Sequence, residues 1–301
     1  MTATPADPLP RPASARLEGN LLAAASTLVW AAGFPAAEGL LATWDPVAAV
    51  AGRFAMALLL LVPLWLLLEG VPRGFRWGPG LLVGALGFGG SATTLLWAQA
   101  VTDPVTVAVI ASASPLCATL VEWALSGRRL TGAFVMGLGA SVAGGVIATM
   151  GAGGGEGNLA LGAALAVGSC LLYSWASHEA VRRMPGRTVL AQSTVTAMGA
   201  GAATVAFFGV MAALGRAALP EGAFAPGSLG LLAIYGMGAI AVTQVLFIGA
   251  VRKIGVALAS FHINVAPFYV MLILVALGGE WSWTQAGGAA VVAGGVLLAQ
   301  R

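Results

Sequence analysis

The sequence predicts an all-α integral membrane protein with ten transmembrane helices, arranged as two inverted five-helix repeats around a central cavity. Composition predicts the membrane, because 59% of the 301 residues are hydrophobic and only 8% are charged. In a soluble domain about 25% of the residues are charged. An internal repeat predicts two equivalent halves, and the charges of the connecting loops predict how these halves are oriented.

The repeat is visible directly in the sequence. The five residues at 142–146, Val-Ala-Gly-Gly-Val, recur at 292–296, an offset of 150 residues (292 − 142). The Ala-Val pair at 100–101 recurs at 250–251 with the same spacing. Because 150 residues is half of the chain, we interpret the sequence as one unit duplicated in tandem.

The loops of the two copies carry opposite charges. After the shared Ala-Val pair the first half has Asp103, where the second has Arg252 and Lys253; in the next loop Arg128 of the first half is matched by Glu280. Positive charge marks cytoplasmic loops, so matching loops of opposite charge indicate halves of opposite orientation. Five spans per half is an odd number, and the second copy therefore enters from the other side. Inverted repeats of this kind are typical of transporters.

A helix that crosses a bilayer needs roughly 20 mainly apolar residues. Ten segments meet this requirement, near 20–40, 47–68, 80–100, 105–125, 132–150, 159–178, 189–214, 229–250, 255–277 and 284–299. Trp281 and Trp283 mark the interface end of the last one. We divide the chain into a disordered cytoplasmic tail at 1–17, a first repeat at 18–150 and a second, inverted repeat at 151–301.

The positive-inside rule predicts that both termini are cytoplasmic. With the N-terminus inside, twelve of the fourteen Lys and Arg residues lie on the cytoplasmic side: Arg11, Arg16, Arg73, Arg76, Arg128, Arg129, Arg182, Arg183, Arg187, Arg252, Lys253 and Arg301. The net charge of +3 is therefore a topology signal, and no nucleic-acid partner is expected. The proline-rich start is no signal peptide, because the apolar run after it is too long and lacks a cleavage pattern.

Two pairs of small or kinking residues recur between the halves. Pro115 and Pro267 interrupt the fourth and ninth spans, where a proline removes a backbone hydrogen bond and bends the helix, so we expect hinges there. Gly137 and Gly144 in the fifth span match Gly287 and Gly294 in the tenth. Small residues at a heptad interval predict close helix packing.

The second half carries a family signature. Its residues are Leu-Gly-Gly-Glu at 277–280, Trp-Thr-Gln at 283–285, Gly288, and Val-Ala-Gly-Gly-Val at 292–296. The chain resembles the drug/metabolite transporter superfamily in these residues. Within that superfamily it looks like the ten-helix branch of bacterial metabolite and amino-acid exporters, and most like an aromatic amino-acid exporter. The resemblance covers residues 18–300 and departs at Arg128, opposite Glu280, so we expect no functional role for that acid. It implies two inverted bundles enclosing a cavity in a bacterial inner (plasma) membrane, and export as the direction.

Polar and aromatic residues at helical spacing predict a substrate site. Residues four apart share a helix face, and two such faces recur at an offset of 143: Ser26, Trp30 and Phe34, and Ser169, Tyr173 and Ser177. His262 and Asn264 lie about 12–15 Å from the end of their span, near the bilayer midplane. The expected substrate-binding residues are Trp30, Phe34, Thr94, Trp97, Ser112, Tyr173, Gln244, His262 and Asn264. The alternatives are hydroxyl groups bonded to their own backbone, tryptophans at the membrane interface, and amides in structural bonds between helices.

Absences narrow the class of solute. No acid lies in the middle of the first span, which argues against a small multidrug exchanger as the class of this protein. No Lys or Arg pair lies at mid-membrane, so no residues are in place to bind the phosphates of a nucleotide sugar. Arg53, six residues into the second span, either snorkels outward or pairs with Glu38. The sequence thus predicts export of amino acids, aromatic ones included, by alternating access. Exporters of other small metabolites or cationic drugs are the alternative.

No enzymatic or metal chemistry is expected. The chain has only two His and none of the motifs of zinc proteases or serine hydrolases. Cys117 and Cys170 fall within spans and are expected to be packing residues. We therefore expect no cofactor, no metal and a monomer, with an amino acid and the lipid bilayer as partners.

Overall fold

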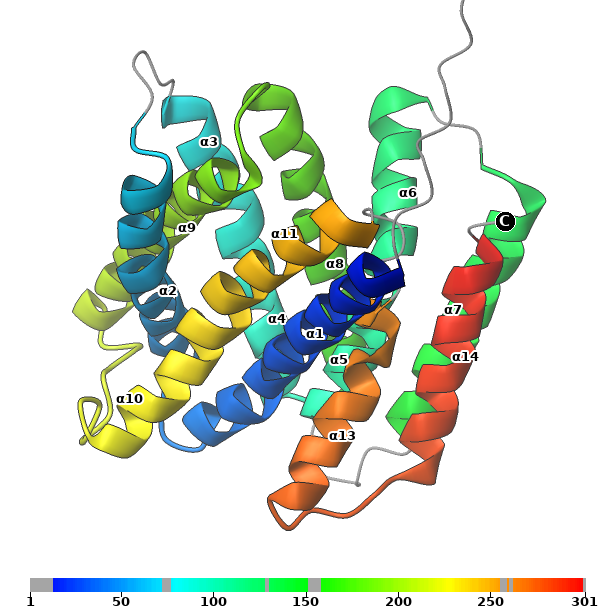
Figure 1. The fold of residues 1–301 in the computed structure, drawn as a ribbon. Helices are drawn as coiled ribbons and strands as arrows, with labels where there is room; N and C mark the ends of the chain where they lie inside the picture. The colour runs from blue at the N-terminus through cyan, green and yellow to red at the C-terminus, as the bar shows by residue number, and fades with distance from the viewer. Residues whose placement is uncertain are drawn as a thin grey trace, which may run out of the picture.

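The computed structural model of the chain describes residues 13–71, 77–127, 130–150, 158–254, 259 and 262–299. Within these residues it contains helices and no strands (Figure 1). Most of the predicted tail, residues 1–12, lies outside the described residues. So do the basic residues Arg11, Arg73, Arg76, Arg128, Arg129 and Arg301.

The helices of the first half start where the sequence offers caps. Asp45 and Asp103 accept hydrogen bonds from the backbone N–H groups of Val47 and Thr106, at 2.8 and 2.9 Å, and a proline follows each of them, the usual start of a helix. The elements are α1 (Ala13–Leu41), α2 (Pro46–Leu68), α3 (Trp77–Val83), η1 (Gly84–Gly89), α4 (Gly90–Ala100), α5 (Pro104–Ser112), α6 (Ser114–Ser126) and α7 (Gly132–Met150).

The second half is built in the same way. Asn158 and Thr188 cap two of its helices, accepting bonds from the N–H groups of Leu161 and Ala191 at 3.0 and 3.1 Å. The elements are α8 (Leu159–Arg183), α9 (Val189–Ala213), α10 (Pro226–Leu232), η2 (Ala233–Val242), α11 (Thr243–Ile254), η3 (His262–Val265), α13 (Ala266–Ala276) and α14 (Trp283–Ala299).

Two of the long helical segments contain a stretch of π-helix, which the sequence did not predict. These stretches are η1, between α3 and α4, and η2, between α10 and α11. Both are rich in glycine, and π-helical turns inside longer helices occur frequently at functional sites. They divide the predicted third and eighth spans near their middle.

In the described part of the chain, six helical segments are long and apolar enough to cross a membrane, and a seventh is added if the bent pair α5–α6 is one span. The two parts of that pair meet at 46°. Three shorter apolar helices run over Gly132–Ala148, His262–Ala276 and Trp283–Ala299. The protein is thus an all-helical, multi-pass membrane protein, as the composition predicts.

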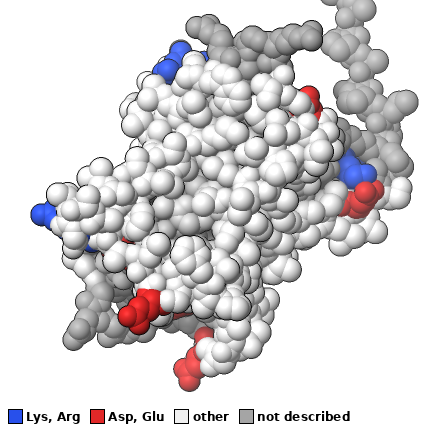
Figure 2. Space-filling view, turned by 90° about the vertical axis from the view of Figure 1, so that its left-hand side faces the viewer, with Lys and Arg blue, Asp and Glu red and all other residues white. Residues whose placement is uncertain are grey.

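The outer surface supports the membrane location. On α2 and α9, large apolar side chains are exposed, among them Leu59 at 64%, Leu67 at 83% and Val210 at 58%. Figure 2 shows that the middle of one face carries no charged side chains, while Lys, Arg, Asp and Glu lie towards its edges. Such a surface is stable against lipid tails and unfavourable in water.

Helices α7 and α14 form a side-by-side pair at one edge of the molecule (Figure 1). Gly137 lies against Gly295, and Gly144 lies against Gly288, so the two helices run antiparallel. The prediction of a glycine contact is correct for Gly137 and Gly144. It is wrong by one residue on α14, because Gly287 and Gly294 have no neighbouring atoms within 4 Å of a Cβ position.

We predict that Gly288→Leu destabilises the protein and that Gly287→Leu does not. A Cβ at Gly288 would lie 2.6 Å from the Ala148 nitrogen and from the Gly144 oxygen, and the backbone of α7 cannot give way. Overpacking of this kind costs about 1–3 kcal/mol. Thermal unfolding in detergent measures the difference between the neighbouring variants. Equal unfolding temperatures would show that the α7–α14 pair does not depend on close glycine contact.

Candidate functional site

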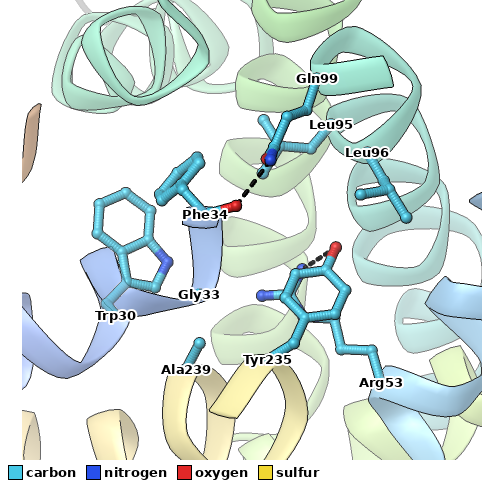
Figure 3. A pocket seen from close by; sticks show the side chains of 9 residues that line it. All are labelled: Trp30, Gly33, Phe34, Arg53, Leu95, Leu96, Gln99, Tyr235 and Ala239. Atoms are coloured by element: carbon cyan, nitrogen blue, oxygen red, sulfur yellow. Dashed lines mark hydrogen bonds between the residues drawn. The ribbon is translucent and has the colours of Figure 1, made fainter. Parts of the chain in front are cut away.

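One pocket lies among α1, α2, α4 and η2. It is lined by Trp30, Gly33, Phe34, Arg53, Leu95, Leu96, Gln99, Tyr235 and Ala239 (Figure 3). We call it the Arg53 pocket. Its cavity volume is about 20 Å³, room for little more than one water molecule, so a larger solute enters only when the surrounding helices move apart. Three of the contributing helices belong to the first half of the chain, and η2 belongs to the second.

Arg53 is the charged residue of this pocket, and it is 8% exposed. One terminal nitrogen, Nη1, donates to the Tyr235 hydroxyl oxygen at 3.3 Å, and the guanidinium carbon lies 4.3 Å from the centre of the Tyr235 ring. The Nε atom is buried and has no hydrogen-bond partner among the described residues. The predicted ion pair with Glu38 is wrong, since Arg53 forms no salt bridge within the described chain and Glu38 is exposed.

The contacts of Arg53 compensate its charge only in part. A cation–π contact contributes about 0.5–2 kcal/mol, and the bond to Tyr235 adds to it, but Nε keeps no partner among the described residues. Arg53 does not snorkel either, because its side chain stays inside the protein. The pocket therefore holds a positive charge that the described residues leave without a carboxylate.

Glycine allows α2 and η2 to approach closely enough to place Arg53 against Tyr235. A Cβ atom at Gly236 would overlap the carbonyl oxygen of Arg53 and would lie 2.8 Å from the Met56 Cβ. Gly236 directly follows Tyr235 on the π-helical stretch. The backbone contact at Gly236 therefore fixes the tyrosine beside the guanidinium.

An aromatic pair forms the opposite part of the pocket. The rings of Trp30 and Phe34 lie one helical turn apart on α1, with centres 5.2 Å apart in an edge-to-face arrangement. Gln99 of α4 donates from Nε2 to the Phe34 carbonyl oxygen at 2.7 Å (Figure 3). Pro35 follows Phe34 inside the helix and lacks the N–H that would bond the preceding turn. Gln99 thus ties α4 to α1 at the point where the helix is weakest.

The structure brings some of the predicted site residues together and leaves others apart. Trp30 and Phe34 line the Arg53 pocket. The hydroxyl groups of Thr94 and Ser112 donate to carbonyl oxygens of their own helices, at 3.0 and 2.7 Å. Both hydroxyl groups are thus engaged by the backbone, which was the alternative considered for them from the sequence.

Trp97 and Tyr173 lie outside the lining of the Arg53 pocket. Trp97 contacts Phe207 of α9 edge to face, with ring centres 6.5 Å apart. Tyr173 contacts Phe88 of η1 at 5.3 Å and is 51% exposed. These two residues belong to other helix contacts.

Gln244, His262 and Asn264 also lie outside the pocket lining. Gln244 is half-buried on α11, and the other two lie on the short 3₁₀ turn η3, where Asn264 is buried. Pro115 and Pro267 stand in the first turns of α6 and α13, just after a break in each span. A proline in a first turn removes no helical hydrogen bond; the bend of α5–α6 lies before Pro115, and a 3₁₀ turn precedes Pro267.

Arg53, Gln99 and Tyr235 are the pocket residues that the sequence interpretation missed. Each is a polar side chain within an apolar span, and an ionisable residue at such a position is a site candidate by default. From the sequence, Arg53 is expected to snorkel outward or to pair with Glu38, because it lies six residues from the start of its span. The position of a residue along its span does not determine whether its side chain reaches water. The packing of neighbouring helices determines this.

The comparisons with known proteins agree with this architecture. Residues 17–150 match the EamA-like transporter family. This match supports the resemblance to the drug/metabolite transporter superfamily and a membrane transporter of small molecules, as opposed to an enzyme. The match does not identify the exporter branch of the superfamily, and it does not identify an aromatic amino acid as the substrate. No curated protein matches the chain.

A solved structure, described only as "Crystal structure of protein", is similar over almost the whole chain. The match covers 95% of this chain and 96% of that one, with a TM-score of 0.65 and 22% sequence identity. At this identity the likeness concerns the fold. Both halves of the chain, including the second half that lies outside the family match, take part in it.

We predict that Gly236→Ala destabilises the α2–η2 contact and that Gly230→Ala does not. The added methyl group at Gly236 meets the backbone of Arg53, which cannot move aside, whereas nothing lies within 4 Å of a Cβ at Gly230. We expect a loss of about 1–3 kcal/mol for the first variant. The second gains up to about 1 kcal/mol, since alanine favours a helix over glycine. Thermal unfolding compares them, and a stable Gly236→Ala protein would contradict the backbone contact.

Proposed function

We propose that this protein exports amino acids, aromatic ones included, by alternating access of two inverted five-helix repeats in a bacterial inner membrane. The observation that carries the proposal is the Arg53 pocket, in which Trp30 and Phe34 of the first half face a space closed by Tyr235 and Ala239 of the second. Aromatic side chains offer apolar surface and edge-to-face contacts to an aromatic solute. Export as the direction follows from the family resemblance.

Contacts between the halves support the duplication. The Ser26 hydroxyl donates to the Thr243 carbonyl at 3.0 Å, joining α1 to α11. The Ser169 hydroxyl donates to the Ser91 carbonyl at 2.8 Å, joining α8 to α4. These contacts are equivalent, because α1 and α8 correspond at an offset of 143 (169 − 26) and α11 and α4 at 152 (243 − 91). The second value differs by two residues from the offset of 150 in the sequence repeat.

The same offsets relate the two glycine contacts at the π-helical stretches. Gly236 meets the backbone oxygen of Arg53, and Gly84 meets the backbone oxygen of Thr196. The differences are again 152 (236 − 84) and 143 (196 − 53). If a two-fold axis relates the halves, each contact from the first half to the second has a counterpart from the second half to the first. The two glycine contacts form such a pair.

The orientation of equivalent helices supports the inversion. Helices α7 and α14 correspond in the two repeats and pack antiparallel. Two helices related by a two-fold axis run antiparallel when that axis is perpendicular to the helix axes, and parallel when it runs along them. For helices that cross a membrane, such an axis lies in the membrane plane, which is the geometry of an inverted repeat.

Two breaks support alternating access. Span α5–α6 bends by 46° before Pro115, and η3 precedes Pro267 in the corresponding span of the second half. Broken helices near the middle of a membrane allow one part of a bundle to move against the other. We propose that the pocket opens to alternate sides by movement at these two breaks.

We predict that wild-type protein in liposomes exchanges labelled phenylalanine with aromatic amino acids, and that Trp30→Ala and Phe34→Ala lower this exchange by on the order of tenfold, since each removes part of the aromatic surface. The control is Trp283→Ala, because Trp283 is 81% exposed and lies outside the pocket. Counter-flow with a mixed amino-acid panel is the measurement.

Two results would argue against the proposal. Unchanged exchange in both pocket variants would remove the aromatic pair from the substrate site. Exchange of a cationic aromatic amine, with no movement of any amino acid, would favour the drug exporter that the sequence left as an alternative.

A further inference from the structure

We propose that Arg53 is the carboxylate-binding residue of the Arg53 pocket and restricts its substrates to solutes that carry a carboxylate beside an apolar body. The inference rests on the proposed function for its amino-acid substrates. It goes beyond that function in naming the charged group that a substrate must have. It applies equally to other organic acids of similar size.

The guanidinium of Arg53 offers hydrogen-bond donors to a solute in the pocket. Arg53 is 8% exposed and lines the pocket, its Nε is buried without a partner among the described residues, and Nη1 has only the Tyr235 hydroxyl at a long 3.3 Å. A guanidinium has five N–H donors in a planar fork that matches the two oxygens of a carboxylate. Nε therefore lacks an acceptor among the described residues, and a carboxylate bound beside the guanidinium would supply one.

No described acid competes with a solute for this guanidinium. None of the ion pairs between described residues includes Arg53; they join Glu179 to Arg182 and Arg183, and Glu18 to Lys253. The aromatic and aliphatic walls lower the local dielectric constant, so the attraction between the guanidinium and a carboxylate is stronger there than in solution. A buried cation also repels a cationic solute, which disfavours the cationic drugs of the alternative function.

The charge of Arg53 breaks the two-fold relation between the halves. At the offsets that relate the contacts of the halves, the counterpart of Arg53 is Thr196 and that of Tyr235 is Val83 (235 − 152). The Thr196 hydroxyl donates to the Gln192 carbonyl of its own helix at 2.8 Å. The second half thus has no cation at this place. A symmetric scaffold with one cation selects one orientation of an asymmetric solute.

The rest of the pocket lining suits an apolar body and an ammonium group. Trp30 and Phe34 supply an apolar surface across the pocket from Arg53 (Figure 3). Gln99 uses its Nε2 on the Phe34 carbonyl, and its Oε1 has no donor among the described residues. An amide oxygen of this kind accepts a hydrogen bond from an ammonium group. An aromatic amino acid has a carboxylate for Arg53, a ring for Trp30 and Phe34, and an ammonium group for Gln99. An aromatic acid without an amine has only the first two of these groups.

The experiment compares four probes on purified protein: L-phenylalanine, L-phenylalaninol, which lacks the carboxylate, 3-phenylpropionate, which lacks the amine, and benzoate. Binding is measured by the concentration dependence of thermal stabilisation. We expect wild-type protein to bind phenylalanine at least tenfold more tightly than phenylalaninol, and to bind 3-phenylpropionate as well. Arg53→Gln is expected to lower phenylalanine affinity at least tenfold while changing phenylalaninol affinity by less than about threefold.

Two further variants keep the test decisive if Arg53→Gln does not fold. Arg53→Lys keeps the charge without the planar fork, and we expect it to retain the preference for carboxylates with a three- to tenfold loss of affinity. Tyr235→Phe removes the hydroxyl that accepts a hydrogen bond from Arg53 and is expected to retain the preference. Arg216→Gln, at an exposed arginine, is the matched control and should bind all four probes as wild type does.

The outcomes separate the inference from the proposed function. Amino-acid exchange that is insensitive to Arg53 would overturn the inference and leave the function standing. Arg53-dependent binding of 3-phenylpropionate or benzoate, without exchange of any amino acid, would support the inference and overturn the function. Equal wild-type affinity for phenylalanine and phenylalaninol, or no binding of any of the three carboxylates, would overturn the inference.

Discussion

Close contact between helix backbones at glycine is the constraint on which the rest of this structure depends. Lipid tails are as apolar as leucine, so apolar side chains alone do not drive membrane helices together, and close packing supplies much of the attraction. At Gly236 the π-helical stretch η2 touches the backbone of α2, and at Gly84 the stretch η1 touches α9. Any side chain at these two positions would separate the helices. The shape of the pocket is therefore set by backbones, which cannot repack as side chains do.

This constraint explains how the protein holds a buried cation. The contact at Gly236 places Tyr235 against Arg53, and the ring and hydroxyl of the tyrosine partly compensate the guanidinium. The compensation is incomplete, because Nε remains without a partner among the described residues. A fully paired arginine would be a structural element with no capacity for a solute. A partly paired one, beside an aromatic pair, is stable enough to fold and still able to bind an anion.

The two halves have the same contacts but different chemistry. The contacts at Ser26 and Thr243 recur at Ser169 and Ser91, while the position of Arg53 is taken in the other half by Thr196. In the repeat that we propose, the scaffold keeps these contacts, since small residues at helix contacts tolerate little change. The residues that face the pocket have diverged. Such divergence gives a symmetric bundle an asymmetric site, which is what an asymmetric solute requires.

The sequence by itself determined the helical membrane class, because apolar runs of bilayer length have no other stable form in lipid. It also placed the starts of two spans at 47 and 105, close to the observed starts of α2 and α5, and it singled out Trp30 and Phe34, since local spacing decides helix faces. Only the tertiary structure decided that Gly288, and not Gly287, faces α7, because a shift of one residue turns a helix face by about 100°. It also decided that Arg53 is buried. Whether a cation near a helix end reaches water depends on the neighbouring helices, and these come from distant parts of the chain.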